Sequence, residues 1–203
     1  MTTGQKFLKR SFDILASFIG LVIFFPFIFL IAFVAFLDTK ANGFYSDFRI
    51  GRKGKAFRMY KIRSMRKSSH FPPTSITIST DSRITPFGRF LRTTKMDELP
   101  QLWNVLIGDM SFVGPRPDVP GFSDKLQGED RIILSIRPGI TGSASLAFRN
   151  EERLLAQQPD PEKYNREIIW PEKIRLNKAY IQNYSFGRDM KIIWDTIFFV
   201  NKK

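Results

Sequence analysis

The sequence predicts an α+β fold: an N-terminal membrane helix, then a small sheet covered by helices, several of them amphipathic and interfacial. Three observations predict it. Residues 14–37 form an uncharged apolar run, glycines separate short apolar and basic segments after residue 43, and helical periodicity recurs in the second half. A chain of 203 residues can bury one sizeable core. We therefore expect a membrane-embedded part at residues 1–40 and one globular domain at residues 41–203.

The apolar run is long enough to cross a bilayer as a helix, but its flanks and its centre favour a different path. Both flanks are basic, which places both on the cytoplasmic side. Pro26 stands at the midpoint and bends a helix, leaving two arms of about 18 Å each, whereas the hydrocarbon layer is about 30 Å thick. A re-entrant helix–turn–helix with its kink at Pro26 satisfies both observations, and an ordinary kinked transmembrane helix is the alternative.

The segments that follow predict a strand, a basic turn and a second strand within residues 43–65, the second strand around Phe57–Ile62. A Ser-, Thr- and Pro-rich loop at residues 66–82 contains the only histidine, His70, which we interpret as a solvated side chain. Phe87–Thr94 is short, basic and amphipathic and predicts a helix. A second helix is expected to begin at Asp97, because aspartate is a good N-cap and proline is tolerated in a first turn.

The second half predicts a strand at Ile132–Ile136 that runs into a turn at Arg137–Gly142. Helices are expected at Arg149–Gln157 and Pro171–Tyr184. A final helix carries large apolar residues at helical spacing. It suits either the core or the membrane interface, and its bulkiest side chains are Trp194, Phe198 and Phe199.

The charge of the chain restricts its partners. The formal net charge is +13, from 32 Lys and Arg against 19 Asp and Glu, which indicates nucleic acid, anionic membrane lipids or phosphorylated substrates. The membrane segment favours the last two, and the chain lacks the interleaved aromatic and basic motifs typical of RNA binding. There is no cysteine, which excludes a disulfide framework and a thiolate metal site.

Asp97 and Glu98 are adjacent carboxylates at a predicted helix start, where free N–H groups and the helix dipole favour carboxylates and bound phosphates. Asp97 is a candidate nucleophile toward phosphorus, a step that forms an acyl phosphate, and Glu98 is a candidate to hold a metal or position a group. The structural alternative is an N-cap followed by a favourable first-turn charge.

Arg116 strengthens the chemical interpretation, because it lies between two prolines after Gly114 and its guanidinium suits bidentate phosphate contact. Arg137 and Arg149 bracket a second glycine–proline turn. With no cysteine and one histidine, zinc is not supported, and Mg²⁺ bridging Asp97, Glu98 and a diphosphate is the metal that the composition allows.

Several motifs in fixed order cover nearly the whole chain: Lys9-Arg10-x-Phe12-Asp13, the proline-centred apolar run, Arg49-x-Gly51-x-x-Gly54-Lys55-x-Phe57, Lys61-x-Arg63-Ser64-Met65, Asp97-Glu98-Leu99-Pro100-Gln101-Leu102, Gly108-Asp109-Met110-Ser111-Phe112-Val113-Gly114-Pro115-Arg116-Pro117 and Arg137-Pro138-Gly139-Ile140-Thr141-Gly142. With them the chain resembles bacterial sugar transferases of the monotopic phosphoglycosyl transferase family.

The resemblance implies a cytoplasmic catalytic domain at the bacterial inner membrane that uses Mg²⁺, a UDP-sugar and undecaprenyl phosphate to initiate glycan assembly. Asp97 would attack the sugar-linked phosphorus and release UMP, and the phosphosugar would pass to the lipid phosphate. Glu98 matches the second residue of the catalytic dyad, and Arg116 and Arg149 match phosphate-binding arginines.

Three further cations complete the candidate phosphate- or substrate-binding residues: Arg137, Lys61 and Arg63. Three positions depart from the family pattern. Phe25 stands where many relatives have serine before the kink proline, and Asp47 and Ser145 each replace a frequent glutamine.

Two other functions remain open. A basic membrane-tethered protein that binds lipid or nucleic acid predicts little sensitivity to Asp97 and steep salt dependence. A UDP-sugar diphosphohydrolase shares the site but uses water as the final acceptor. The sugar, the glycan pathway and the oligomeric state are left undetermined by the sequence.

Overall fold

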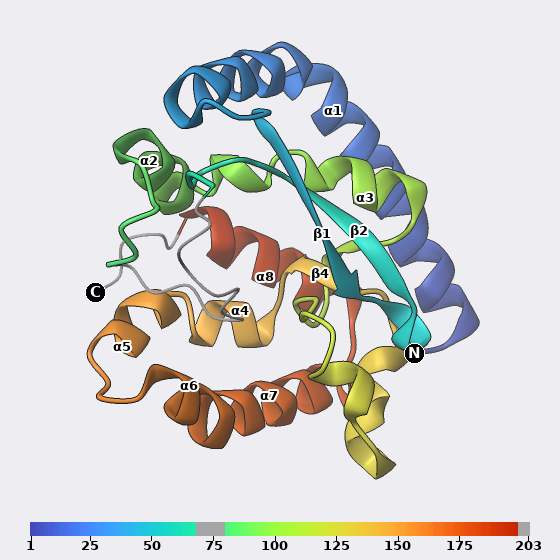
Figure 1. Cartoon of the computed structure of the whole chain (residues 1–203). Coiled ribbons are helices and arrows are strands. Elements are labelled where there is room, and N and C mark those ends of the chain that lie inside the picture. Colours follow the sequence, from blue (N-terminus) through green and yellow to red (C-terminus); the bar gives the residue numbers. More distant parts are fainter. Residues whose placement is uncertain (68–79, 199–203) are drawn as a thin grey trace.

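The computed structural model describes residues 1–67 and 80–198, and its architecture is α+β, as predicted (Figure 1). Short 3-10 and π-helical turns join the regular elements. In chain order the elements are α1 (Thr3–Thr39), β1 (Phe44–Ile50), η1 (Arg52–Gly54), β2 (Ala56–Ile62), α2 (Pro86–Thr94), η2 (Met96–Glu98), α3 (Gln101–Ile107), β3 (Ser111–Val113), η3 (Ser123–Lys125), η4 (Gly128–Ser135), β4 (Gly139–Thr141), α4 (Ser143–Ala147), α5 (Glu151–Ala156), α6 (Pro161–Tyr164), η5 (Asn165–Ile169), α7 (Trp170–Gln182) and α8 (Phe186–Phe198).

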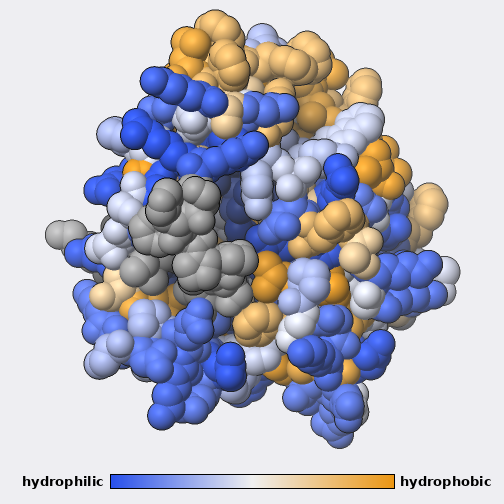
Figure 2. All heavy atoms as spheres, viewed as in Figure 1, coloured by the Kyte–Doolittle hydropathy of each residue, from blue (hydrophilic) through white to orange (hydrophobic). Residues whose placement is uncertain are grey.

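Helix α1 is long and apolar enough to cross a membrane, and most of its apolar side chains are exposed. Thr2 begins it with a capping box, in which its side chain accepts a hydrogen bond from the backbone N–H of Gln5. The helix is continuous through Pro26, so the expected helix–turn–helix is instead one bent helix (Figure 1). Hydrophobic side chains gather over this helix at the top of the molecule (Figure 2).

Both ends of α1 pack on the globular domain. Near its start, Lys9, Asp13 and Ser17 are buried. Asp13 Oδ1 accepts two hydrogen bonds from β3, one from Ser111 Oγ and one from the Phe112 backbone N–H, each at 3.1 Å. Near the other end, Ala35 joins Ile62 of β2 and Leu91 of α2 in a buried cluster. One domain therefore contacts the helix on both sides of the bend.

The predicted hairpin is confirmed. Strands β1 and β2 pair antiparallel from Phe44↔Ile62 to Ile50↔Ala56. Gly54 closes the turn between them with a φ of 76°, in the left-handed region where glycine carries no Cβ penalty. The hairpin rests on α3, because the Asn104 side chain donates to the Arg58 carbonyl at 2.7 Å and accepts from the Tyr60 N–H at 3.0 Å.

The strand predicted at Ile132–Ile136 is wrong, because most of that segment belongs to the 3-10 helix η4. The strand lies just beyond it: β4 falls within the predicted turn and pairs in parallel with β3, as Ser111↔Gly139 and Val113↔Thr141. Glycine permits this approach, since a Cβ on Gly139 would lie 2.2 Å from the Gly114 nitrogen. The molecule thus has two small two-stranded sheets in its described part, rather than one.

The predicted helices of the second half are confirmed within a few residues as α5, α7 and α8, and α2 covers the segment predicted at Phe87–Thr94. Most of the predicted loop at residues 66–82, with His70, and Phe199 lie outside the described residues. Helices α7 and α8 build the largest core cluster, in which Tyr180, Tyr184 and Ile192 pack with Val113 of β3 and Leu134 of η4.

A buried ion pair joins α1 to this core. Lys9 Nζ lies 2.6 Å from Asp189 Oδ2 on α8, and the hydroxyls of Tyr180 and Tyr184 donate to the Asp189 carboxylate at 2.5 Å and 3.3 Å. A buried charge that keeps hydrogen-bonded partners is tolerated, whereas one left alone is costly.

We therefore expect Asp189→Ala to lower the free energy of unfolding by about 3–5 kcal/mol, because it leaves Lys9 charged and uncompensated. Thermal unfolding of the detergent-purified protein measures the loss. Glu172→Ala is the control, because it breaks an exposed ion pair with Arg175 and is expected to leave the midpoint unchanged. Equal midpoints for Asp189→Ala and wild type would show that the buried pair contributes nothing.

Candidate active site

The two adjacent carboxylates lie in the short 3-10 turn η2 rather than at the start of a helix. Helix α2 ends at Thr94, and its C-cap Lys95 reverses the chain with a left-handed φ of 59°. Helix α3 begins only at Gln101, after Pro100. The expectation that Asp97 caps a helix is thus wrong, because the chain needs a tight turn between two helices at this point. The N-cap position of α3 is instead Pro100, and that of η2 is Lys95.

Glu98 is held by two cations from other parts of the chain. Its Oε1 lies 3.2 Å from Lys61 Nζ of β2 and pairs with Arg116 Nη2, while Arg116 Nη1 donates to Oε2 at 3.3 Å. Glu98 is 7% exposed. Burial raises the pKa of its carboxyl, but the charges of Arg116 and Lys61 outweigh that effect and leave the pKa below the ordinary value. Glu98 is therefore a fixed anion.

Asp97 has the opposite surroundings. It is 4% exposed, and its Oδ1 is buried without a hydrogen-bond partner in the described part of the chain. Burial raises the pKa of the Asp97 carboxyl, and the charge of Lys61 acts against that rise. Two neighbouring carboxylates therefore differ: Glu98 is engaged by two cations, whereas Asp97 has a buried oxygen without a hydrogen-bond partner among the described residues.

Arg116 reaches the site through the pairing of β3 and β4. The arginine follows β3 in the turn Gly114–Pro117, and this turn is fixed by hydrogen bonds from Gly114 N–H to the Thr141 carbonyl at 2.9 Å and from Gly139 N–H to the Pro115 carbonyl at 2.9 Å. The Arg116 side chain remains 40% exposed even though it pairs with buried Glu98. Its guanidinium has five N–H donors, so it can hold Glu98 and a phosphate together.

The structure brings Lys61, Glu98 and Arg116 into contact, beside Asp97, and gives the other predicted cations different partners. Arg63 Nε donates to the Asn42 carbonyl at 2.6 Å, and its guanidinium lies over the Tyr45 ring. Arg137 Nε donates to the Gly108 carbonyl at 2.7 Å, and Arg149 Nη2 donates to the Thr196 carbonyl at 2.8 Å. Phosphate contact by Arg63, Arg137 and Arg149 stays a prediction.

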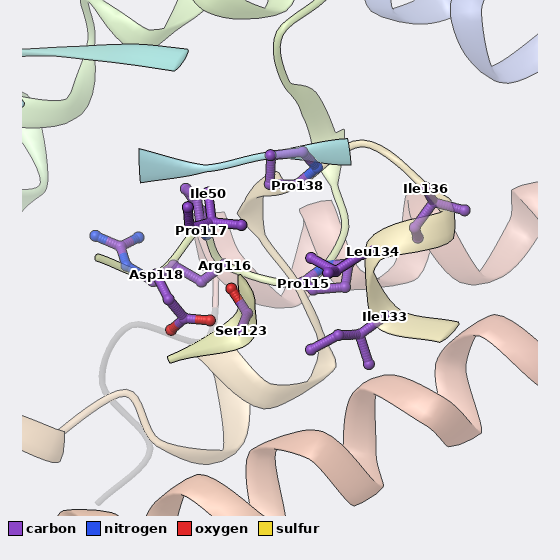
Figure 3. A pocket seen from close by; sticks show the side chains of 11 residues that line it. Ile50, Pro115, Arg116, Pro117, Asp118, Ser123, Ile133, Leu134, Ile136 and Pro138 are labelled. Carbon is purple, nitrogen blue, oxygen red and sulfur yellow. The ribbon is translucent and has the colours of Figure 1, made fainter. Parts of the chain in front are cut away.

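Asp118 is a carboxylate that the sequence analysis did not select. It follows the Pro115-Arg116-Pro117 turn and lines a small cavity of about 10 Å³ with Arg116, with apolar Ile133 and Leu134 on another side (Figure 3). That volume is close to the minimum for one water molecule, so the cavity belongs to the scaffold and not to a substrate pocket. Burial raises the pKa of Asp118 to about 7, with the charge of Lys173 acting against the rise.

The dyad supplies ligands of the kind that Mg²⁺ prefers. Asp97 Oδ1 has no hydrogen-bond partner among residues 1–67 and 80–198, so it would suit the ion, whereas the Glu98 oxygens already contact Lys61 and Arg116. No group of three or more His, Asp or Glu side chains gathers within the described residues. A bound Mg²⁺ would then take Asp97 as its main protein ligand and complete its coordination with phosphate oxygens and water.

Comparison with known proteins identifies the chain's relatives. Residues 4–203 match the model of the family described as bacterial sugar transferase. The exopolysaccharide production protein PSS of Rhizobium leguminosarum is 35% identical over 197 residues, which are 94% of this chain and 93% of the relative.

Two relatives have names that state a reaction. The undecaprenyl-phosphate galactose phosphotransferase of Salmonella typhimurium is 32% identical over 210 residues, 95% of this chain and 40% of that protein. The UDP-glucose:undecaprenyl-phosphate glucose-1-phosphate transferase of Klebsiella pneumoniae is 34% identical over 201 residues, 96% of this chain and 40% of that protein. The chain thus spans about two fifths of the length of these two relatives.

The raised pKa of Asp118 predicts a pH-dependent stability. A carboxyl whose pKa is higher in the folded state contributes its full stabilisation at a pH below its ordinary pKa, which is near 4. This contribution is lost as the pH rises through about 7, the pKa of Asp118 in the folded state. Asp118→Asn removes the titrating group. As the pH rises from 5 to 8, the free energy of unfolding of this variant should therefore increase by about 1–2 kcal/mol relative to that of wild type, allowing for partial exposure. Denaturant unfolding at both pH values measures this. A constant difference between the two proteins would contradict the prediction.

Proposed function

The chain belongs to the bacterial sugar transferase family, and we propose that it transfers a phosphosugar from a UDP-sugar to undecaprenyl phosphate and releases UMP. The named relatives support the donor and acceptor classes, because they act on undecaprenyl phosphate and one of them is named for UDP-glucose. The observation that carries the mechanism is the contrast within the dyad: Glu98 is held by Lys61 and Arg116, while Asp97 Oδ1 has no hydrogen-bond partner.

The first step uses Asp97 as the nucleophile. A carboxylate oxygen of Asp97 attacks the sugar-linked phosphorus, and the bond from that phosphorus to the bridging oxygen of the diphosphate breaks. UMP leaves with the bonding electrons, and the sugar phosphate remains on Asp97 as an acyl phosphate. Arg116 is exposed enough to contact the phosphate oxygens, and Glu98 keeps both Arg116 and Lys61 in place for that contact.

The second step regenerates the enzyme. An oxygen of undecaprenyl phosphate attacks the same phosphorus, the bond to Asp97 breaks, and the lipid-linked diphosphate sugar leaves while Asp97 returns as a carboxylate. The two anionic substrates use one cationic site in turn, so their charges are never held together there. When bound, Mg²⁺ would neutralise charge on the phosphate oxygens.

A re-entrant path for α1 and a cytoplasmic position of the domain are part of this proposal. The contacts at both ends of α1 support the path, because Lys9 and Asp13 pack against α8 and β3 while Ala35 packs against β2 and α2. A single domain lies on one side of a membrane, so both ends of a helix that packs on it face that side. The basic flanks support the cytoplasmic side, because Lys and Arg prefer it.

We expect Asp97→Asn to abolish both UMP release and covalent labelling, because an amide is a poor nucleophile and cannot form the acyl phosphate. Glu98→Gln keeps the side-chain shape but weakens the hold on Arg116 and Lys61, so labelling should slow by about 100-fold or more without disappearing. Intact-mass spectrometry with a panel of UDP-sugars, with and without undecaprenyl phosphate, measures the adduct.

Asp195→Asn on α8 is the matched control and should label at the wild-type rate. Labelling of Asp97→Asn at the wild-type rate would refute the nucleophile assignment. Release of free sugar phosphate without the lipid acceptor would instead identify a diphosphohydrolase.

The re-entrant path predicts that residues before and after α1's bend are labelled from the same side of the membrane. The chain has no cysteine, so Gly4→Cys and Ala41→Cys each report one position against a silent background. A membrane-impermeant maleimide should modify both in inverted vesicles and neither in right-side-out vesicles. Modification of the two variants from opposite sides would establish a spanning helix.

A further inference from the structure

Gln101 is a buried amide directly after the dyad, in the first position of α3. It is 0% exposed, and neither its Nε2 nor its Oε1 has a hydrogen-bond partner in the described part of the molecule. A buried polar group left without a partner costs about 1–3 kcal/mol, and folded proteins keep few of them. We therefore look for a hydrogen-bond partner that the Gln101 amide gains when substrate binds.

The position of Gln101 follows from its neighbours at three-residue spacing. Glu98 contacts Lys61 of β2, and Asn104 contacts the backbone of Arg58 and Tyr60 on the same strand. Between η2 and α3, Leu99 and Pro100 keep right-handed helical backbone angles. Residues three apart on such a backbone share one face, so Gln101 stands between these two contacts and faces β2 behind the dyad. Asn104, one turn further on, has both ends of its amide bonded, which makes the unpartnered amide of Gln101 distinctive.

A complementary unpartnered atom lies four residues earlier. Asp97 Oδ1 is a buried acceptor without a donor, and Gln101 Nε2 is a buried donor without an acceptor. Because the backbone stays right-handed helical from η2 through Leu99 and Pro100 into α3, side chains four residues apart can meet there, and Gln–Asp hydrogen bonds are among such pairs. A carboxylate oxygen has two lone pairs, so Oδ1 can accept this bond and still contact a cation.

We propose that Gln101 is a positioning residue for the nucleophile: its Nε2 donates to Asp97 Oδ1 in the substrate complex and leaves the other carboxylate oxygen aimed at the sugar-linked phosphorus. The inference rests on the proposed function and adds a role for a residue that touches neither substrate. A hydrogen bond to one oxygen restricts rotation of the carboxylate and so orients the other oxygen for attack.

The test is Gln101→Met, which keeps the length and burial of the side chain and removes the amide. A single-turnover measurement follows adduct formation by intact mass with a UDP-sugar that labels wild type. We expect the rate to fall about 10- to 100-fold, while the Kd for the UDP-sugar stays the same and the unfolding midpoint is unchanged or higher. If Gln101 plays no part in catalysis, the substitution should have the same effect on the unfolding midpoint but should not slow adduct formation.

A second substitution and a matched control sharpen the result. Gln101→Glu keeps the size but removes the donor, so it should slow adduct formation at least as much as Gln101→Met. Asn177→Leu on α7 removes another buried amide with an unpartnered Oδ1 and should leave the rate unchanged.

Two results would overturn the proposal: Gln101→Met labelling as fast as wild type, or a rate loss matched by an equal loss of UDP-sugar binding, which would mean that Gln101 contacts substrate. Failure of the proposed function is distinguishable, because wild type itself would then form no adduct.

Discussion

The shared ion pairs of Glu98 are the constraint on which the site depends. A buried carboxylate is costly unless cations and hydrogen bonds compensate it, and here Lys61 comes from β2 and Arg116 from the turn after β3. Three segments must therefore meet before any one of their charges is satisfied. Because Glu98 takes both cations, Asp97 beside it keeps an oxygen without a hydrogen-bond partner in the described part of the chain, as the proposed nucleophile requires.

The same logic extends from the site to the membrane helix. Asp13 of α1 accepts hydrogen bonds from Ser111 and Phe112 of β3, and β3 pairs with β4 to fix the turn that presents Arg116. The glycines at this crossing allow the two backbones to approach where any Cβ would collide. Hydrogen bonds thus connect α1 to β3, and β3 leads directly into the turn that holds Arg116.

Local patterns predicted the elements whose cause is local. Amphipathic spacing identified α2, α7 and α8, and glycine punctuation identified the hairpin, but β4 was misplaced because its pairing depends on close backbone approach at Gly139. The start of α3 was misplaced because Lys95 adopts a left-handed conformation before the dyad. Motifs selected Lys61, Glu98 and Arg116, which do meet, whereas burial alone distinguishes Asp118, and burial is not visible in a sequence.

The pairing of Lys9 with Asp189 has a consequence for how the protein is made. The two residues are 180 positions apart, so α1 leaves the ribosome with a cation whose partner has not yet been synthesised. Until α8 is made, the Lys9 charge must remain hydrated, and the domain cannot close over the start of α1. Completion of the core therefore waits for the last helix, and the start of α1 is among the last surfaces to be covered.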